Sequence, residues 1–298
     1  MSVVLTPELQ LRVRRDEPMA KHTSWRVGGP ADLFFTPRDR NELATFLRSL
    51  PRGTPLYWVG LGSNLLVRDG GIRGVVICTH GAFTRLERRA HQRVYCEAGV
   101  PCTRLARQCG KWELGQAEFF AGIPGTFGGA LAMNAGAYGG ETWSFVRSVE
   151  LMDRDGQVRA RAPGEFQVAY RHVAGPAANE WFLAAELEFG LPSTDEVSTV
   201  RALSERRRQT QPLGEWSCGS VFTNPPGDHA ARLIDSAGLK GYRIGGAVVA
   251  EKHANFILNE KDATARDLEA LIGHIQQTVQ RVHGVALVPE VRIVGEAL

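Results

Sequence analysis

Two glycine-rich segments contain the residues most suited to holding a ligand. The first is Gly60-Leu61-Gly62-Ser63-Asn64-Leu65, and the second extends over residues 121–140. Glycine allows the main chain to approach a ligand closely, and successive N–H groups in such loops can bind phosphate. Either segment alone is also consistent with an ordinary turn. Two of them in one chain favour a large, flat or phosphorylated ligand.

Neither the first loop nor the serine-containing segment near residue 220 matches a common catalytic motif. Leu65 stands where the dinucleotide-binding fingerprint needs its third glycine, and a strand rather than a helix is expected after it. The segment Cys218-Gly219-Ser220 lacks the GxSxG spacing of a hydrolase nucleophile. The eight histidines show no HExxH pattern or other ligand spacing, so we expect no metal site.

The bulk composition is that of an ordinary globular protein. Over 298 residues the formal net charge is only +3, which gives no support for binding nucleic acid. The five cysteines are odd in number and lack CxxC spacing, as expected of reduced thiols in a cytoplasmic protein. The charged N-terminal segment has no signal-peptide core, and no apolar run approaches the ~20 residues of a membrane span. We therefore expect a cytoplasmic chain with no membrane partner.

The hydrophobic pattern predicts the elements that position the first loop. Strands are expected at 33–35, 56–59, 65–67 and 74–78, so this loop connects two strands. Apolar residues at helical spacing predict a helix over 37–50, with Thr36 as its cap and Pro37 at its first position. The second glycine-rich segment shows only weak helical periodicity.

The rest of the chain predicts an α+β protein with two lobes. An Asp-Gly pair favours a hairpin between strands at 146–152 and 158–160, and Thr264, Asp267 and Gly284 delimit a strong helix. A composition shift at 192–196 indicates a linker, followed by a helix that begins near Val197. We expect one domain over 1–192, with its core at about 27–191, and another over 193–298. The last strand, within 288–298, is a candidate for packing back on the first domain.

Several motifs, in a fixed order, resemble those of the UDP-N-acetylenolpyruvoylglucosamine reductase family over roughly residues 21–295. They are Gly60-Leu61-Gly62-Ser63-Asn64-Leu65-Leu66, Ile123-Pro124-Gly125-Thr126-Phe127-Gly128-Gly129, Asn134-Ala135-Gly136-Ala137-Tyr138-Gly139, Tyr170-Arg171, Gly219-Ser220-Val221-Phe222-Thr223-Asn224-Pro225, Gly238-Leu239-Lys240-Gly241, Ile244-Gly245-Gly246-Ala247, Glu251-Lys252-His253-Ala254-Asn255-Phe256 and Pro289-Glu290-Val291-Arg292. The ordered set is far more specific than any one of its members.

The resemblance implies a fold, a reaction and two cofactors. The fold would be a vanillyl-alcohol-oxidase-type (PCMH-like) FAD-binding fold in two subdomains, followed by a smaller α+β substrate domain. The reaction would be NADPH-dependent reduction of UDP-N-acetylglucosamine enolpyruvate to UDP-N-acetylmuramate through non-covalent FAD, in peptidoglycan precursor synthesis. The compact length is similar to the shorter branch of the family, which lacks an inserted lid with a substrate-binding Tyr. We also expect a monomer.

The resemblance also implies roles for individual residues. Arg171 and Glu290 would stabilise the substrate carboxylate as charge develops, with Glu290 protonated through a raised pKa, and Ser220 would protonate the α-carbon. Substrate contacts would come from Tyr170, Asn224, Lys240 and His253. Cofactor contacts would come from Gly60, Gly62, Ser63, Asn64, Leu65, Gly122, Ile123, Pro124, Gly125, Gly128, Gly129, Asn134, Ala135, Gly136 and Tyr138.

Two departures from the family pattern concern the substrate diphosphate. Thr223 and Thr210 stand where the family usually has Lys, and Arg206 to Arg208 are the candidates to compensate. Two other functions stay open at this point. One is an FAD-dependent alcohol or sugar oxidase of the same fold. The other is a non-catalytic nucleotide-sugar binding protein, which would keep the glycine loops without needing Arg171, Ser220 and Glu290 together.

Overall fold

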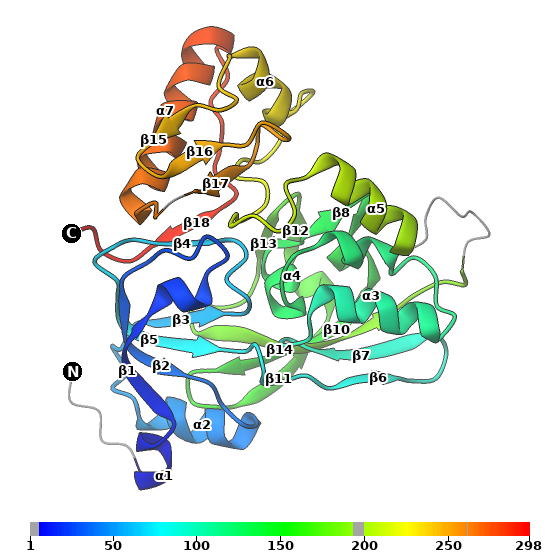
Figure 1. The fold of residues 1–298 in the computed structure, drawn as a ribbon. Helices are drawn as coiled ribbons and strands as arrows, with labels where there is room; N and C mark the ends of the chain where they lie inside the picture. The colour runs from blue at the N-terminus through cyan, green and yellow to red at the C-terminus, as the bar shows by residue number, and fades with distance from the viewer. Residues whose placement is uncertain (1–5, 193–199, 261) are drawn as a thin grey trace. The chain divides into compact units, whose positions relative to one another are not determined.

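The computed structural model describes residues 6–192, 200–260 and 262–298, which divide into two compact units (Figure 1). Unit 1 comprises residues 1–15, 33–60 and 74–206, and unit 2 comprises residues 16–32, 61–73 and 207–298. The chain therefore passes between the units several times. This division differs from the single boundary expected near residue 193, because two N-terminal segments join the C-terminal residues. The expected linker lies, apart from Pro192, outside the described residues, as does the expected helix start at Val197.

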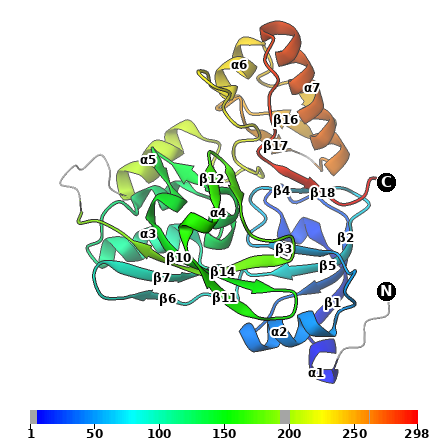
Figure 2. The ribbon, with the colours of Figure 1, turned by 180° about the vertical axis from the view of Figure 1, so that it is seen from behind.

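Unit 1 is built on a five-stranded antiparallel sheet in the order β11-β10-β14-β7-β6. Helices α3 and α4 lie over one face of this sheet in both ribbon views (Figures 1 and 2). The strands are β6 (Leu86–Arg88), β7 (Arg93–Glu97), β10 (Val146–Asp153), β11 (Val158–Arg161) and β14 (Glu180–Glu188), and the helices are α3 (Cys102–Lys111) and α4 (Phe127–Met133). As expected, the Asp-Gly turn joins β10 and β11.

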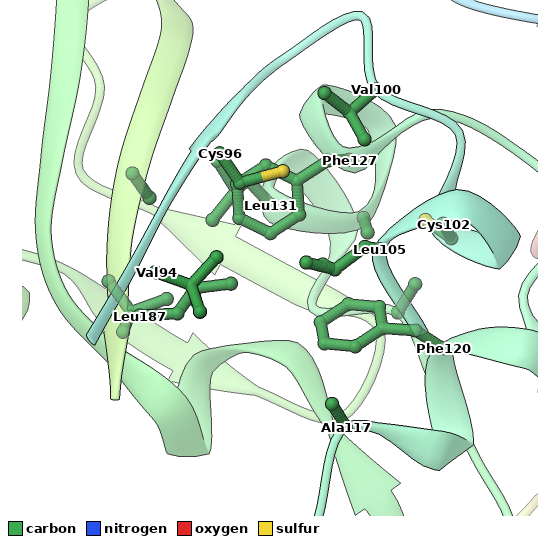
Figure 3. Close-up of a cluster of buried hydrophobic side chains, with 14 of the residues drawn as sticks. Val94, Cys96, Val100, Cys102, Leu105, Ala117, Phe120, Phe127, Leu131 and Leu187 are labelled. Carbon is green, nitrogen blue, oxygen red and sulfur yellow. The ribbon is translucent and has the colours of Figure 1, made fainter. Parts of the chain in front are cut away.

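The core of unit 1 forms where these helices meet the sheet. Val94 and Leu187 point from the strands toward Leu105, Phe120 and Leu131, and all five side chains are almost fully buried (Figure 3). Burial of each large apolar side chain contributes roughly 1.5–3 kcal/mol. This packing supports the second glycine-rich segment, which includes α4, β8 (Gly136–Ala137) and the ends of η2 (Glu118–Gly122) and β9 (Gly140–Glu141). The other short elements of unit 1 are η3 (Thr142–Phe145), η4 (Pro163–Glu165), β12 (Gln167–Ala169) and β13 (His172–Ala174).

A second sheet, in the order β1-β2-β5-β3, contains the strands expected at 33–35, 56–59 and 74–78. Its members are β1 (Val13–Pro18), β2 (Pro30–Phe35), β5 (Ile72–Cys78) and β3 (Leu56–Val59), and the short α1 (Pro7–Gln10) and η1 (Met19–His22) flank β1. Helix α2 (Arg40–Ser49) begins later than expected, since its cap is Asp39 and not Thr36. Asp39 accepts from the Glu42 N–H at 2.8 Å. A carboxylate at this position also complements the helix dipole.

Unit 2 packs α6 and α7 against a three-stranded sheet in the order β15-β16-β17 (Figure 1). Its elements are α6 (Ala230–Ser236), β15 (Arg243–Ile244), β16 (Ala247–Val249), β17 (Ile257–Asn259) and α7 (Ala265–His283), while α5 (Val200–Thr210) crosses the boundary between the units. Helix α7 has the expected caps, a Thr264–Asp267 capping box and a left-handed Gly284.

Two N-terminal segments are integral parts of unit 2. Trp25 is fully buried, and its indole N–H donates to Ile257 O at 2.7 Å. Strand β4 (Leu65–Val67) pairs in parallel with the last strand, β18 (Arg292–Val294). These long-range contacts place the first glycine loop next to the C-terminal strand. No helix in the described part of the chain has the length and apolar character needed to span a bilayer.

All five cysteines are free and buried. Burial raises the pKa of Cys102, Cys109 and Cys218 to about 12, and it raises the pKa of Cys78 and Cys96 as well. Only the thiolate reacts readily with disulfide reagents. The native thiols should therefore be unreactive.

We predict that a disulfide reagent at pH 8 modifies the native thiols about 10³-fold more slowly than an exposed cysteine. Denaturant should then release all five. A Ser236→Cys variant, which adds a thiol at an exposed helix position, is the positive control and should react rapidly at one site. Rapid modification of any thiol in the unmodified protein would contradict the burial described above.

Candidate active site

Arg171 lies at the tip of a hairpin in unit 1 that the sequence pattern did not reveal. Strands β12 and β13 pair with Ala169 opposite His172, so Tyr170 and Arg171 form a two-residue turn. Arg171 has a left-handed backbone (φ 55°), which a non-glycine residue rarely adopts. Its guanidinium donates to Gly136 O at 3.0 Å and lies 5.0 Å from the centre of the Tyr170 ring. The second glycine-rich segment thus contacts the side chain expected to bind the substrate carboxylate.

Asn134, expected to contact the cofactor, instead uses its side chain within unit 1. It is buried and left-handed at the C-terminus of α4 (φ 46°). Its Nδ2 donates to Glu141 Oε2 at 3.0 Å and to Ala169 O at 3.2 Å, and its Oδ1 accepts from Trp143 N at 3.1 Å. The bond to Ala169 supports the hairpin that presents Arg171. Any cofactor contact at this position would therefore use the main chain.

The other expected cofactor residues of unit 1 divide into open and packed positions. A Cβ added at Gly129 would meet no atom within 4 Å, so this part of α4 leaves room for a ligand against the backbone. A Cβ at Gly60 would lie 2.2 Å from the Thr126 hydroxyl, and one at Gly122 would lie 2.6 Å from the Tyr138 ring. The side chains of Ile123 and Ala135 belong to the core.

Five further expected cofactor positions in unit 1 have structural contacts of their own. Gly128 packs against Ala98, Gly125 O accepts from Cys102 N, and Gly136 O accepts from Arg171. The Tyr138 hydroxyl donates to Leu203 O at 2.9 Å. Pro124 is exposed before α4. These contacts shape the loop, and they leave its proposed role toward FAD as a proposal.

The first glycine loop continues in unit 2 with the features of an anion-binding turn. Gly62 has φ 62°, and a Cβ there would lie 1.9 Å from His22 O, so no larger residue fits. The N–H groups of Gly62 and Ser63 have no hydrogen-bond partner within the described ranges. Unpaired adjacent N–H groups suit a phosphate oxygen. The loop therefore offers main-chain donors of the kind that bind a phosphate group.

Asn64 and Leu65 connect this loop to the residues expected to be catalytic. Asn64 Nδ2 donates to Glu290 O at 3.0 Å, and Leu65 pairs with Arg292 in the β4–β18 ladder. Leu65 O also accepts from Cys218 Sγ at 3.5 Å. The Asn64 amide, expected on the cofactor, thus contacts the main chain of Glu290.

Ser220 and Glu290 lie on adjacent segments of unit 2. Ser220 follows Gly219, which has φ 76°, and precedes Val221, whose carbonyl accepts from Glu290 N at 2.8 Å. The Ser220 side chain is half-buried, and its hydroxyl bonds to no residue in the described part of the chain. A hydroxyl placed in this way is available to a substrate.

Lys240 and His253, expected to bind substrate, also lie close together in unit 2. Burial, and then the charge of Lys240, hold the pKa of His253 below its usual value. Its Nδ1 is buried and has no partner among the described residues. Lys240 forms an ion pair with Asp235 at 2.7 Å. The neutral imidazole therefore keeps a polar atom for a ligand.

Asn224 and Thr223 have side-chain contacts that limit their roles. Asn224 Oδ1 accepts from Ala230 N at 3.1 Å at the start of α6, so its Nδ2 is the group left for a substrate contact. Thr223 donates from both N and Oγ1 to Val288 O, at 3.0 and 3.2 Å. Its hydroxyl is directed to the C-terminal segment and does not replace the lysine usual in the family.

A separate cavity of about 950 Å³ in unit 2 contains none of these residues. It is lined by Gly28, Arg68, Thr264 and Glu269, among others, at the N-terminus of α7. There, Asp69 accepts from the N–H groups of Ala265 and Arg266, both at 3.0 Å. The helix terminus is therefore already capped by a carboxylate. Within the described ranges no group of His, Cys, Asp and Glu side chains is arranged to hold a metal.

Two family models match separate parts of the chain. Residues 31–160 match the family model of the FAD binding domain, and residues 211–294 match that of the UDP-N-acetylenolpyruvoylglucosamine reductase C-terminal domain. The structure is similar to the UDP-N-acetylenolpyruvylglucosamine reductase of Thermus caldophilus, with a TM-score of 0.81 and 32% identity over 95% of this chain and 98% of that one. The expected FAD-binding α+β fold is confirmed.

Two curated sequences are still more similar. The UDP-N-acetylenolpyruvoylglucosamine reductase of Alkalilimnicola ehrlichii is 59% identical over 96% of this chain and 95% of its own length. That of Methylococcus capsulatus is 57% identical over 94% of this chain and 92% of its own. With this identity over almost the whole length, the chain belongs to the UDP-N-acetylenolpyruvoylglucosamine reductase family.

Proposed function

We propose that this chain reduces UDP-N-acetylglucosamine enolpyruvate to UDP-N-acetylmuramate, using NADPH and FAD, with Arg171, Ser220 and Glu290 as its catalytic residues. Family membership makes the chain an FAD-dependent oxidoreductase of peptidoglycan synthesis. The observation that carries the residue assignment is the position of Ser220. Its hydroxyl bonds to no described residue and is one residue from the carbonyl that pairs with Glu290 N.

The reaction adds a hydride and a proton across the enol ether double bond. Bound within the part of the chain that matches the FAD binding domain, FAD would supply hydride transfer from NADPH to the CH₂ carbon of the substrate. Negative charge then develops on the α-carbon and its carboxylate. Fixed charges and acids beside such a centre are usually the largest catalytic contribution. Arg171 supplies a permanent positive charge, and a protonated Glu290 donates a hydrogen bond.

Ser220 completes the reaction by transferring its hydroxyl proton to the α-carbon. A neutral hydroxyl is a weak acid, but a carbanion-like carbon is a strong base. A positioned acid typically contributes ~10²–10⁴ to a rate. The product is the lactyl ether, and the serine recovers its proton from solvent.

The substrate nucleotide is held, in this proposal, by Tyr170, Asn224, Lys240 and His253. The lowered pKa of His253 keeps its imidazole neutral near pH 7. For the diphosphate we propose Arg206 to Arg208, since the Thr223 hydroxyl is bonded to Val288 O. The part of the chain with the FAD binding domain would hold the cofactor, and the C-terminal domain the substrate.

The oxidase alternative would need productive reaction of the reduced flavin with oxygen, whereas the reductase reacts with the enolpyruvyl substrate. Identity to reductases over almost the full length favours the reductase. A non-catalytic nucleotide-sugar binding protein would be purified free of flavin. We further propose that the protein is cytoplasmic and monomeric. Sedimentation of the purified chain tests the monomeric state.

We predict that FAD is bound non-covalently, since the Gly62–Ser63 turn offers main-chain N–H groups to a phosphate. Acid precipitation of the purified yellow protein should leave the colour in the supernatant. Colour in the pellet would instead show a covalent bond. A native protein that is colourless and cannot be reconstituted with FAD would contradict the proposed function.

The second prediction separates the half-reactions at Ser220. Reduction of the flavin by NADPH needs no proton on a substrate carbon, so Ser220→Ala should not change it. Reoxidation by the enolpyruvyl substrate should slow ~10²–10⁴-fold. Anaerobic stopped-flow absorbance measures both steps, with Ser236→Ala in α6 as the control. If the reduced flavin of Ser220→Ala is reoxidised by the substrate as fast as that of the control, the proton comes from another group.

The third prediction concerns Glu290. Glu290→Gln retains a hydrogen-bond donor for the developing oxyanion. Its turnover rate should therefore be at least ~10-fold higher than that of Glu290→Ala. Turnover measured by NADPH oxidation reports the difference. Glu296→Gln, in the same C-terminal segment and paired with Arg73 at 3.1 Å, is the matched control and should change turnover little. Equal and mild effects of both Glu290 variants would remove it from the catalytic set.

A further inference from the structure

Asn255 is a buried residue of unit 2 whose polar groups bond to the segment after Ser220. Only 4% of its surface is exposed. Its Oδ1 accepts from Phe222 N at 3.0 Å, and its Nδ2 donates to Phe222 O at 2.8 Å. Its main-chain carbonyl accepts from Val221 N at 2.9 Å. One residue thus satisfies three of the four main-chain polar groups of residues 221–222.

These three bonds restrain the segment in a way that one bond would not. The side-chain amide pairs with Phe222 as donor and acceptor at once, as a neighbouring strand would. Val221 and Phe222 are themselves almost fully buried. A buried main-chain group left without a partner is strongly unfavourable, so the segment must keep this position relative to Asn255.

The opposite side of the same segment bonds to the residues around Glu290. Val221 O accepts from Glu290 N at 2.8 Å, and Thr223 N donates to Val288 O at 3.0 Å. Phe222 and Pro289 form an isolated bridge between the two segments. Residues 221–223 therefore lie between Asn255 and the segment 288–291.

Glu290 has its own support on its far side. Asn64 Nδ2 donates to Glu290 O at 3.0 Å, and Arg292 N donates to Asn64 O at 3.1 Å. Strand pairing of β18 with β4 continues this contact. Removing Asn255 would leave these contacts of Glu290 in place. Ser220, by contrast, lies between Gly219, with its left-handed backbone, and the residues that Asn255 holds.

We propose that Asn255 is a positioning residue, which holds the main chain after Ser220 so that the hydroxyl is directed at the substrate α-carbon. This inference rests on the proposed role of Ser220 as proton donor. Asn255 acts through Val221 and Phe222 and does not itself touch the substrate. A displacement of about 1 Å at a reacting group can cost ~10² in rate.

The test compares Asn255→Ala with Asn259→Ala by anaerobic stopped-flow of the FAD-loaded protein. Asn259 is the matched control, because it is also buried and bonds Trp25 O at 2.7 Å and Ala263 N at 2.9 Å, away from residues 221–223. Both variants should lower the melting temperature. Only Asn255→Ala should slow reoxidation by the enolpyruvyl substrate, by ~10–10². Reduction by NADPH should change less than about twofold in either variant, since it needs no proton donor.

A double variant tests whether Asn255 acts through Ser220. With the hydroxyl already absent, Asn255→Ala should slow reoxidation little further, so the effects of Ser220→Ala and Asn255→Ala should be strongly non-additive. Full additivity would overturn the proposal. Equal slowing of reoxidation by Asn255→Ala and Asn259→Ala would overturn it too.

Asn255→Gln provides a second test in case Asn255→Ala does not fold. If Asn255→Ala does not fold, Asn255→Gln keeps the amide but displaces it by one methylene, and the same selective slowing is expected. Normal reoxidation by a folded Asn255→Gln would then contradict the proposal. If Ser220→Ala itself reoxidises normally, the proposed function of Ser220 fails, and that result is distinct from a failure of Asn255 alone.

Discussion

The buried main chain of residues 221–223 is the constraint on which the proposed chemistry in unit 2 depends. Main-chain groups removed from water must find partners inside the protein, because an unpaired one costs about 1–3 kcal/mol. Here the partners come from Asn255 on one side and from residues 288–291 on the other. Satisfying both sides at once determines where Ser220 lies relative to the main chain of Glu290. The position of the hydroxyl that we propose as proton donor thus follows from main-chain hydrogen bonding.

Unit 1 uses a buried asparagine for a similar purpose. Asn134 bonds Ala169 O and Trp143 N, and so supports the hairpin that presents Arg171. An asparagine side chain carries a donor and an acceptor in one planar group, which allows it to replace a missing peptide neighbour. In unit 1, these contacts support the hairpin that holds Arg171 in a left-handed conformation, which is unfavourable alone. Residues without a chemical role in the reaction therefore contribute to its geometry.

The sequence by itself determined the features whose signals are local. Thr264 and Gly284 delimit α7, and the Asp-Gly turn joins β10 to β11, because capping and turn preferences act within a few residues. The ordered motifs identified the family, its FAD-binding fold and its reaction. At the start of α2, both Thr36 and Asp39 can cap a helix. The prediction of Thr36 was wrong, because Asp39 is the cap.

Only the tertiary structure decided which distant segments lie together. The pairing of β4 with β18 and the bond from Trp25 to Ile257 join residues more than 200 positions apart, and they assign N-terminal segments to unit 2. The Arg171 hairpin and the bonds of Asn255 to Phe222 were equally absent from the sequence pattern. The physical reason is that a buried amide group can form its hydrogen bonds with any complementary buried polar group. The residue type shows that a partner is required, and only the packed chain shows which one it is.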